Sequence, residues 1–243
     1  MTEINDATDQ RHHFAFCVQY HGGAFRGWQR QHGQASIQGE LERALGIIAN
    51  EPIALRAAGR TDAGVHGTGQ IAAFSTNADR PVDQWLRGVN GLTPATIQVS
   101  WFKPVAAEFH PRFDAVARRY TYLFHDRGRS NPFMSDLAWC TDALDENAMH
   151  VAAQTLLGEH DFSSFRGAGC QSLTPMRRVD RCEVRREGAW GRRCGARRER
   201  SAAPARTPAV GGWRRPWSCS RTAAPHAPHV RRSTAACPTW RRY

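Results

Sequence analysis

The stretch FAFCVQYHGGAFRGWQRQHGQASIQGELERALGIIAN, residues 14–50, decides the fold class, because its hydrophobic period changes once along its length. Residues 14–20 alternate with a period of two, which predicts a strand with four large side chains on one face: Phe14, Phe16, Val18 and Tyr20. From residue 37 onward the spacing is i, i+4, i+8, i+11, which predicts a helix with an apolar stripe: Ile37, Leu41, Leu45 and Ile48. Ser36 is placed to cap the start of this helix, and Asn50 marks its end.

Further strands and helices follow without a regular order. The first half predicts strands at 53–58, 71–74 and 96–102, and a helix that begins near Asp79 and Pro81 and ends before Gly91. The second half predicts a strand at 116–124, a helix at 145–157 that Gly158 closes, and a strand at 179–185. This mixture lacks the βαβ alternation of a parallel sheet. We therefore expect an α+β fold of two modules, 1–107 and 108–188, of which the second is incomplete.

The positive charge of the chain is concentrated at one end. The 243 residues include 33 Lys+Arg and 22 Asp+Glu, a net charge of +11, which by itself suggests a polyanionic partner such as nucleic acid. Residues 1–188 hold 20 basic and 21 acidic residues, a net of −1, whereas residues 189–243 hold 13 Arg and one acid, a net of +12. The overall charge is therefore a property of the last 55 residues.

Residues 189–243 have an unusual composition, because Arg, Ala, Pro and Gly supply 34 of the 55 and there is no Leu, Ile, Phe or Met. Such a segment cannot bury an apolar face of its own, so we expect it not to fold alone and to be disordered. Three interpretations are open: a basic tail that binds RNA, a linker without a role, and the product of a GC-rich gene read out of frame. Four Trp, three Cys and the absence of Lys favour the last.

Several classes of protein are disfavoured. The first ten residues are polar and acidic, unlike a secretory signal, and no apolar run approaches the ~18 residues of a membrane span. The seven cysteines form no CxxC pair, which is typical of reduced thiols in a cytoplasm and not of a disulfide framework or a zinc site.

The most distinctive run is GRTDAGVHGTGQ, residues 59–70, in which four glycines surround one carboxylate, one guanidinium and one imidazole. Composition alone is compatible with a turn between strands in which Asp62 is a solvated acid. The run lacks the Gly-Lys-Ser/Thr ending of a phosphate loop, and Asp62 and His66 have no third metal ligand nearby in sequence, so we expect no metal.

Four blocks in order along the chain resemble the tRNA pseudouridine synthase A family: YHGGAFRGWQRQHGQASIQGELERAL (20–45), GRTDAGVHGTGQ (59–70), FHPRFDAVARRYTYLF (109–124) and LLGEHDFSSFRGAGCQSLTPMRRV (156–179). The resemblance implies two related modules with ferredoxin-like or RRM-like mixed sheets around an RNA-binding cleft. It also implies an isomerase that converts uridine to pseudouridine at positions 38–40 of the tRNA anticodon arm, without a cofactor. A cytoplasmic homodimer with tRNA as its partner is expected on the same basis.

The resemblance also assigns candidate site residues. Asp62 corresponds to the catalytic aspartate, which can act as a nucleophile or base; Arg60 corresponds to the arginine that holds the flipped-out nucleotide, and Tyr120 to the tyrosine that stacks on the uracil. Read without the family, Tyr120 is more readily interpreted as a core aromatic residue on an apolar strand face. His66 and Gln70 are expected to support the loop. Six arginines are candidate RNA contacts: Arg112, Arg118, Arg119, Arg166, Arg177 and Arg178.

The chain departs from the family pattern after the strand at 179–185. Family members continue into an apolar strand and a helix with a Phe-Leu-x-x-Met-Val-Arg pattern, and nothing in 189–243 matches it. We therefore expect apolar surface around Leu156, Leu157 and Phe165 to be uncovered, and little or no activity. The alternative function is a non-catalytic RNA-binding protein that uses the basic segment.

Overall fold

Most strands of the protein join one mixed sheet. The computed structural model describes residues 11–125, 132–166, 173–186, 192–199 and 218–223. The helices are α1 (Ile37–Ala49), α2 (Val82–Leu92) and α3 (Glu146–Gln154), with short 3₁₀ turns η1 (Gly22–Ala24) and η2 (Ser163–Phe165). The strands are β1 (His12–Tyr20), β2 (Arg56–Ala57), β3 (Val65–Thr76), β4 (Ile97–Pro104), β5 (Ala117–His125), β6 (Trp139–Cys140), β7 (Gly158–Asp161), β8 (Met176–Val179), β9 (Arg181–Arg186), β10 (Arg192–Glu199) and β11 (Ser218–Ala223).

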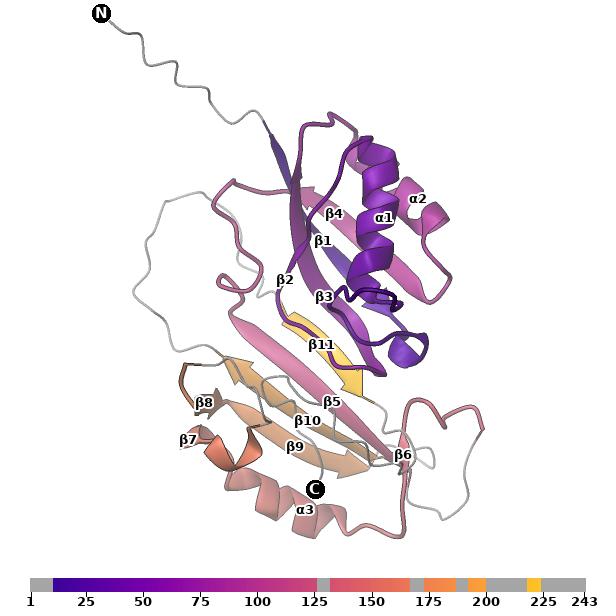
Figure 1. Cartoon of the computed structure of the whole chain (residues 1–243). Coiled ribbons are helices and arrows are strands. Elements are labelled where there is room, and N and C mark those ends of the chain that lie inside the picture. The colour runs from indigo at the N-terminus through magenta and orange to yellow at the C-terminus, as the bar shows by residue number, and fades with distance from the viewer. Residues whose placement is uncertain (1–10, 126–131, 167–172, 187–191, 200–217, 224–243) are drawn as a thin grey trace, which may run out of the picture.

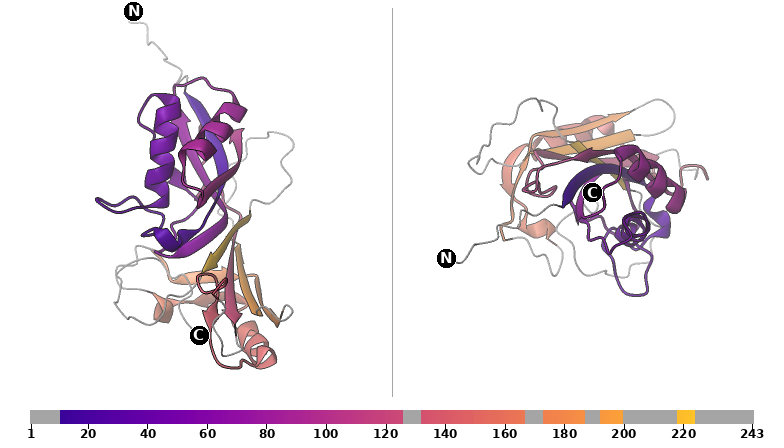
Figure 2. Two further views of the ribbon diagram at one scale, coloured as in Figure 1. Left: turned by 90° about the vertical axis from the view of Figure 1, so that its right-hand side faces the viewer. Right: turned by 90° about the horizontal axis from the view of Figure 1, so that it is seen from above.

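The large sheet has two halves with one strand between them. Its order is β4-β1-β3-β11-β5-β10-β9, with β2 paired to β3 and β6 paired to β5 (Figure 1). Strand β11 is antiparallel to β3 and parallel to β5, so it lies between the N-terminal half and the second half. Helices α1 and α2 lie against the N-terminal half, α3 packs on β9, and β7 and β8 form a separate two-stranded sheet (Figures 1 and 2).

The N-terminal half contains the larger core. Twenty buried side chains form one cluster between the helices and the sheet, as the period-two and period-3.6 patterns of residues 14–50 predict. Phe74 lies at its centre, with ring centroids 5.3 Å from Trp85 and 5.6 Å from Phe14. This core is a stable base for the loop that precedes β3.

The second half has a much smaller core. Its cluster has five buried residues, to which Leu156 and Phe165 contribute as partly buried neighbours. The expectation of uncovered apolar surface is therefore wrong for Leu156 and Phe165, because both are partly buried against this cluster, and right for Leu157, which is 37% exposed. Leu173, fully exposed, and Phe133, 90% exposed, add to the open apolar surface of this half.

Several predicted boundaries differ from the structure. Residues 65–70, expected in a glycine-rich loop, form the first half of β3. The hydrogen bonds between paired strands join backbone groups, so glycine can take part in them as well as any other residue. Helix α2 includes Gly91, and α3 ends at Gln154, three residues early, before a turn that leads to Gly158 at φ +96°. The strand expected at 53–58 is confined to Arg56–Ala57.

The expected disorder of 189–243 is wrong for two stretches. Residues 192–199 form β10 between β5 and β9, and residues 218–223 form β11 between β3 and β5. Strand pairing joins backbone groups, so neighbouring strands can order a segment that has no apolar face of its own. The remaining residues of 189–243 lie outside the described ranges, and an out-of-frame origin stays a prediction.

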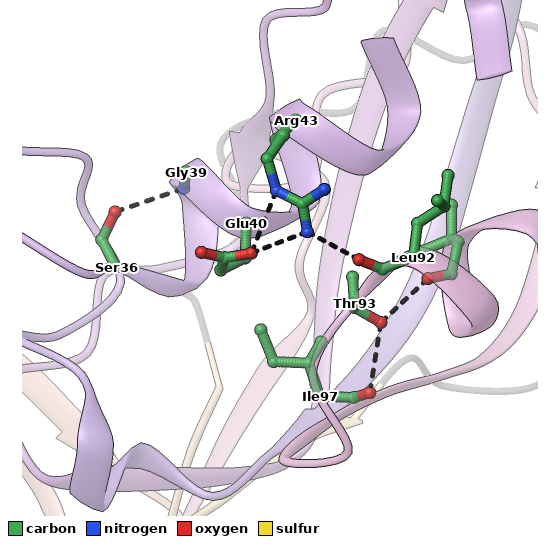
Figure 3. Close-up of polar contacts among 8 residues, drawn as sticks. Ser36, Gly39, Glu40, Arg43, Leu92, Thr93 and Ile97 are labelled. Carbon is green, nitrogen blue, oxygen red and sulfur yellow. Dashed lines mark hydrogen bonds and ion pairs between the residues drawn. The ribbon is translucent and has the colours of Figure 1, made fainter. Parts of the chain in front are cut away.

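Helix α1 begins with the cap that the sequence predicts. The Ser36 hydroxyl accepts a hydrogen bond from the Gly39 amide at 3.2 Å (Figure 3). At the other end, Asn50 ends the helix in the left-handed conformation at φ 56°. In the second turn of α1, Arg43 donates to Glu40 at 2.9 Å and to the Leu92 carbonyl at 2.6 Å, which ties α1 to the end of α2 (Figure 3).

Replacing Ser36 with alanine should destabilise the protein by about 1 kcal/mol, because the Gly39 amide loses its side-chain acceptor. Thermal unfolding should show a melting temperature lower by about 2–4 °C. Ser36→Asp keeps an acceptor at the same position and serves as the control. Equal destabilisation by Asp and Ala would contradict a capping role.

Candidate active site

The loop 58–64, which joins β2 to β3, is fixed along its backbone by the N-terminal half. Each bond holds a different peptide of the loop: Ala58 N donates to Ile71 O at 2.8 Å, Gln70 Nε2 to Gly59 O, Trp28 N to Thr61 O at 2.9 Å, Val65 N to Asp62 O at 3.2 Å, and Gly64 N to Phe25 O at 3.4 Å. A loop held in this way presents its side chains in one arrangement, as a catalytic loop must.

Buried polar groups and a close-packed glycine reinforce the loop from below. The Thr61 hydroxyl, 4% exposed, is hydrogen-bonded to the Tyr20 hydroxyl at 2.9 Å, and Gln70 is fully buried. Gly27 has φ +96°, and a Cβ there would lie 2.7 Å from the Thr61 carbonyl oxygen. Only glycine therefore allows the 21–28 turn to approach the loop this closely.

His66 holds the other end of the loop. Its Nδ1 accepts from the Gly22 amide at 3.2 Å, which leaves Nε2 as the protonated nitrogen that donates to the Asp136 carbonyl at 2.9 Å. The imidazole is 4% exposed and packs edge-on against His21 with centroids 4.2 Å apart. Both ring nitrogens are engaged with backbone, an arrangement that suits the supporting role expected for His66.

The sheet places Tyr120 two strands away from β3, the strand that follows Asp62. Asp62 is half-buried and precedes β3 by three residues, and the half-buried Tyr120 lies on β5. Strand β11 separates them: its residue 221 pairs with Gly67 of β3 on one side and with Tyr120 on the other. Gly67 and Tyr120 are thus two strand spacings, about 10 Å, apart. Arg60 is exposed at the loop surface.

Two of the candidate arginines lie beside the loop. The Arg118 guanidinium donates to the Ala58 carbonyl through Nε at 3.2 Å and Nη2 at 2.7 Å, and to the Arg112 carbonyl at 3.1 Å. Arg118 is half-buried, whereas the Arg112 side chain is exposed, with its guanidinium carbon 6.0 Å from the Phe113 ring centroid. Arg118 therefore binds protein backbone at the position where sequence reasoning expected an RNA contact.

The other four candidate arginines lie on β5, after η2 and on β8. Arg119 is exposed and follows Arg118 on β5, so its side chain points to the opposite face. Arg166 follows η2, and Arg177 and Arg178 lie on β8. Arg177 donates to the Thr174 carbonyl at 2.5 Å, and Arg178 pairs with Asp180 at 2.7 Å. The structure thus places a second basic group on the small sheet β7–β8.

The turn that carries Arg112 contains a titratable group. His110 Nδ1 accepts from the Arg112 amide at 3.2 Å, and the His110 amide donates to the Asp114 carboxylate at 2.8 Å. Partial burial, followed by the positive charge of Arg56, lowers the pKa of His110 from its ordinary 6.5, outweighing the opposing effect of Asp114. Protonation would also remove the acceptor for the Arg112 amide.

The protein should therefore lose stability as the pH falls through about 6.5, because the unfolded state binds the His110 proton at a higher pH than the folded state. His110→Asn keeps an acceptor and removes the titration. Melting temperatures measured at about pH 7.5 and about pH 5.5 should fall more for the unaltered chain than for the variant. An equal fall in both proteins would show that His110 does not contribute.

Three groups that hold the site were missed by sequence reasoning. The Tyr20–Thr61 pair, the Trp28 amide and the Arg118–Ala58 contact join residues 33 to 60 positions apart. The glycines at 22 and 27 were the available signal, because glycine beside a buried strand often marks a close backbone approach. Among the described residues no group of three or more His, Cys, Asp or Glu could hold a metal ion.

Comparison with known proteins decides the family. Residues 16–114 and 152–197 match a family model described as tRNA pseudouridine synthase. The chain belongs to the tRNA pseudouridine synthase family. This confirms the predicted family and α+β fold, and members of the family are isomerases. The match to the tRNA pseudouridine synthase model ends within β10, nine residues beyond the predicted boundary at 188.

Individual relatives agree with the family match. The chain is 49% identical over 175 residues to tRNA pseudouridine synthase A of Aliivibrio salmonicida (strain LFI1238), which is 72% of this chain and 67% of the relative. It is 48% identical over 177 residues to the protein of the same name from Shewanella piezotolerans, covering 72% of this chain and 68% of the relative. Within the described ranges, none of the helices has the length and apolar character that a membrane crossing needs.

Proposed function

We propose that this chain isomerises uridine to pseudouridine in tRNA with Asp62 as the catalytic residue. One observation carries the proposal: the loop that contains Asp62 is held peptide by peptide and opens into β3 about two strand spacings from Tyr120. A fixed carboxylate near an aromatic side chain suits a reaction in which one base is detached, turned and reattached while it stays stacked.

The reaction needs no change in composition. The bond from the ribose C1′ to uracil N1 breaks and a bond from C1′ to C5 forms, while one proton leaves C5 and one is gained at N1. Asp62 supplies the carboxylate that acts at the ribose–uracil junction as nucleophile or base. Tyr120 stacks on the uracil and Arg60 holds the flipped-out nucleotide, whose extrusion costs a few kcal/mol. Neither an oxidant nor an energy source is required, so we propose no cofactor.

The surface around the site suits an RNA backbone. Exposed Arg60 and Arg112 lie at or beside the loop, and further candidate RNA contacts lie on the other face of β5 (Arg119), after η2 (Arg166) and on β8 (Arg177 and Arg178). The relatives named above are tRNA pseudouridine synthases, and on that basis we propose tRNA as the partner and positions 38–40 of the anticodon arm as targets. We also propose a cytoplasmic homodimer, with its cysteines reduced.

Turnover is expected to be far below that of other family members. Residues 189–243 contain no Leu, Ile, Phe or Met, so they cannot form the apolar helix that follows in the family pattern. The small second core and the exposed Leu157 and Leu173 are consistent with the loss of that helix. The basic partner that this helix supplies to the aspartate would be lost with it, which weakens the positioning of Asp62.

The experiment is product mapping under single-turnover conditions. Excess protein is incubated with an unmodified tRNA transcript, and pseudouridine is located by mass spectrometry, with a transcript that carries cytidine at positions 38–40 as the control. Slow formation confined to positions 38–40 supports the proposal. Binding of tRNA without any pseudouridine favours the alternative, a non-catalytic RNA-binding protein. A rate equal to that of the relatives would contradict the expected effect of residues 189–243.

A further inference from the structure

Arg118 links the two halves of the protein at the base of the loop. It lies on β5 in the second half, and its guanidinium donates twice to the carbonyl of Ala58, the first residue of the loop 58–64, with Nη2–O at 2.7 Å. A further bond reaches the Arg112 carbonyl at 3.1 Å. One side chain thus joins β5 to the start of the loop 58–64 and to the turn that carries Arg112.

The contact lies where the halves of the sheet separate. Pairing between β3 and β11 is confined to Val65–Gly67, whereas β11 continues alongside β5 back to Ala117. Beyond that pairing, Ala58 and Ile71 line a small hollow together with Ala117 and residues of the 109–115 turn. Arg118 therefore joins the halves in a region where β11 makes no ladder to β3.

The chemistry of the contact requires a guanidinium. The Ala58 peptide is buried, its amide donates to Ile71, and its carbonyl needs a donor from elsewhere. Arginine offers several N–H groups in a planar fork, so it can direct two at Ala58 and still reach Arg112. Lysine carries the same charge on a single ammonium and cannot reproduce this arrangement.

Arg118 is connected to both Asp62 and Tyr120 of the proposed site. Asp62 follows Ala58 by four residues in a loop that is otherwise held by bonds from Tyr20, Trp28 and Gln70 of the N-terminal half. Tyr120 follows Arg118 by two residues on β5, so both side chains share a face of the strand. A contact between residues 58 and 118 therefore limits how far Asp62 can move relative to Tyr120.

We propose that Arg118 is a positioning residue that fixes the separation of Asp62 and Tyr120 by anchoring the Ala58 carbonyl, an inference that rests on the proposed function. It differs from the phosphate contact that the sequence suggested, because the donors are directed at backbone carbonyls. Its loss should misplace Asp62 and slow the chemical step, while the affinity for tRNA is preserved. A displacement of ~1 Å in such a site can cost about 100-fold in rate.

The experiment compares the full chain with Arg118→Lys and Arg118→Ala, with Arg87→Lys, an exposed arginine on α2, as the matched control. Single-turnover pseudouridine formation on a tRNA transcript, the tRNA dissociation constant at several salt concentrations and backbone hydrogen exchange are measured. For Arg118→Lys we expect a rate lower by about 10- to 100-fold and a dissociation constant changed by less than about twofold. Arg87→Lys should match the unaltered chain.

Hydrogen exchange provides the readout that does not depend on activity. The Trp28 amide donates to Thr61 and the Gly64 amide to Phe25, so both should exchange faster in Arg118→Lys, while α1 keeps its protection. A general loss of stability would instead raise exchange in α1 as well and would overturn a local positioning role. If the unaltered chain forms no pseudouridine, the proposed function fails, and the exchange of Trp28 and Gly64 still tests the contact.

The proposal is overturned if Arg118 behaves as an RNA contact. In that case Arg118→Lys would match the unaltered chain in its rate of pseudouridine formation and in its hydrogen exchange. Arg118→Ala would weaken tRNA binding and reduce by about 1 the magnitude of the slope of log K for tRNA binding against log salt concentration. Should Arg118→Ala fail to fold, the lysine variant alone decides, because it keeps the charge and loses only the fork.

Discussion

Asp62→Asn should abolish pseudouridine formation and leave the fold unchanged. Asparagine has almost the same shape, and the backbone bond from Val65 to the carbonyl of residue 62 is available to either side chain. An amide, however, is a poor nucleophile and cannot accept a proton as a carboxylate does. We expect the single-turnover rate to fall by at least about 10³-fold, to the background of the assay, with an unchanged melting temperature.

The matched control for this prediction is Asp83→Asn. Asp83 is exposed on α2, where it pairs with Arg87 at 2.6 Å, so the variant removes the same charge from a surface away from the loop. It should keep the full rate. Since a neutral residue 62 also repels RNA less, tRNA binding by Asp62→Asn should be equal to or tighter than that of the unaltered chain. A rate for Asp62→Asn within about tenfold of normal would remove Asp62 from the chemistry.

Much of the N-terminal half could be predicted because its elements are determined locally. Helix α1 follows from four apolar residues at helical spacing and from Ser36, whose hydroxyl caps Gly39 as expected. Strand β3 was predicted too short because glycines at 67 and 69 resemble a loop. The structure shows a strand there because β1 and β11 pair with its backbone, and Gly67 leaves room for the Tyr20 ring.

The sequence proposes residues for the candidate site but does not indicate the contacts that hold them. Asp62, Arg60 and Tyr120 were identified through short motifs, whose residues are neighbours in sequence. The bond from Arg118 to Ala58 spans 60 positions, and nothing in either segment specifies the other. Arginine beside an aromatic strand face is typical of RNA binding as well as of carbonyl binding, so composition cannot separate the two roles.

Gly22→Ala should be the most damaging change outside Asp62. Gly22 begins η1 and its amide donates to His66 Nδ1 at 3.2 Å. A Cβ at this position would lie 2.1 Å from the carbonyl oxygen of Val65 and 2.6 Å from its carbonyl carbon. Both atoms are backbone at the start of β3, so no rotamer change can relieve the clash, and the turn and strand must move apart.

We expect Gly22→Ala to cost about 3 kcal/mol of stability and to lower the single-turnover rate by about 100-fold, since a shift of Val65 is passed to Asp62 through their backbone bond. Gly23→Ala is the matched control, because a Cβ there meets only the flexible His21 ring, at 3.0 Å, and the residue is exposed. Urea unfolding and single-turnover assays on both variants provide the comparison. If the two alanines behaved alike, backbone freedom in the turn would explain the effect better than the contact with Val65. A large loss confined to Gly22→Ala would show instead that the turn after β1 holds the catalytic loop by direct backbone contact, and that His66 can bridge them only while residue 22 has no side chain.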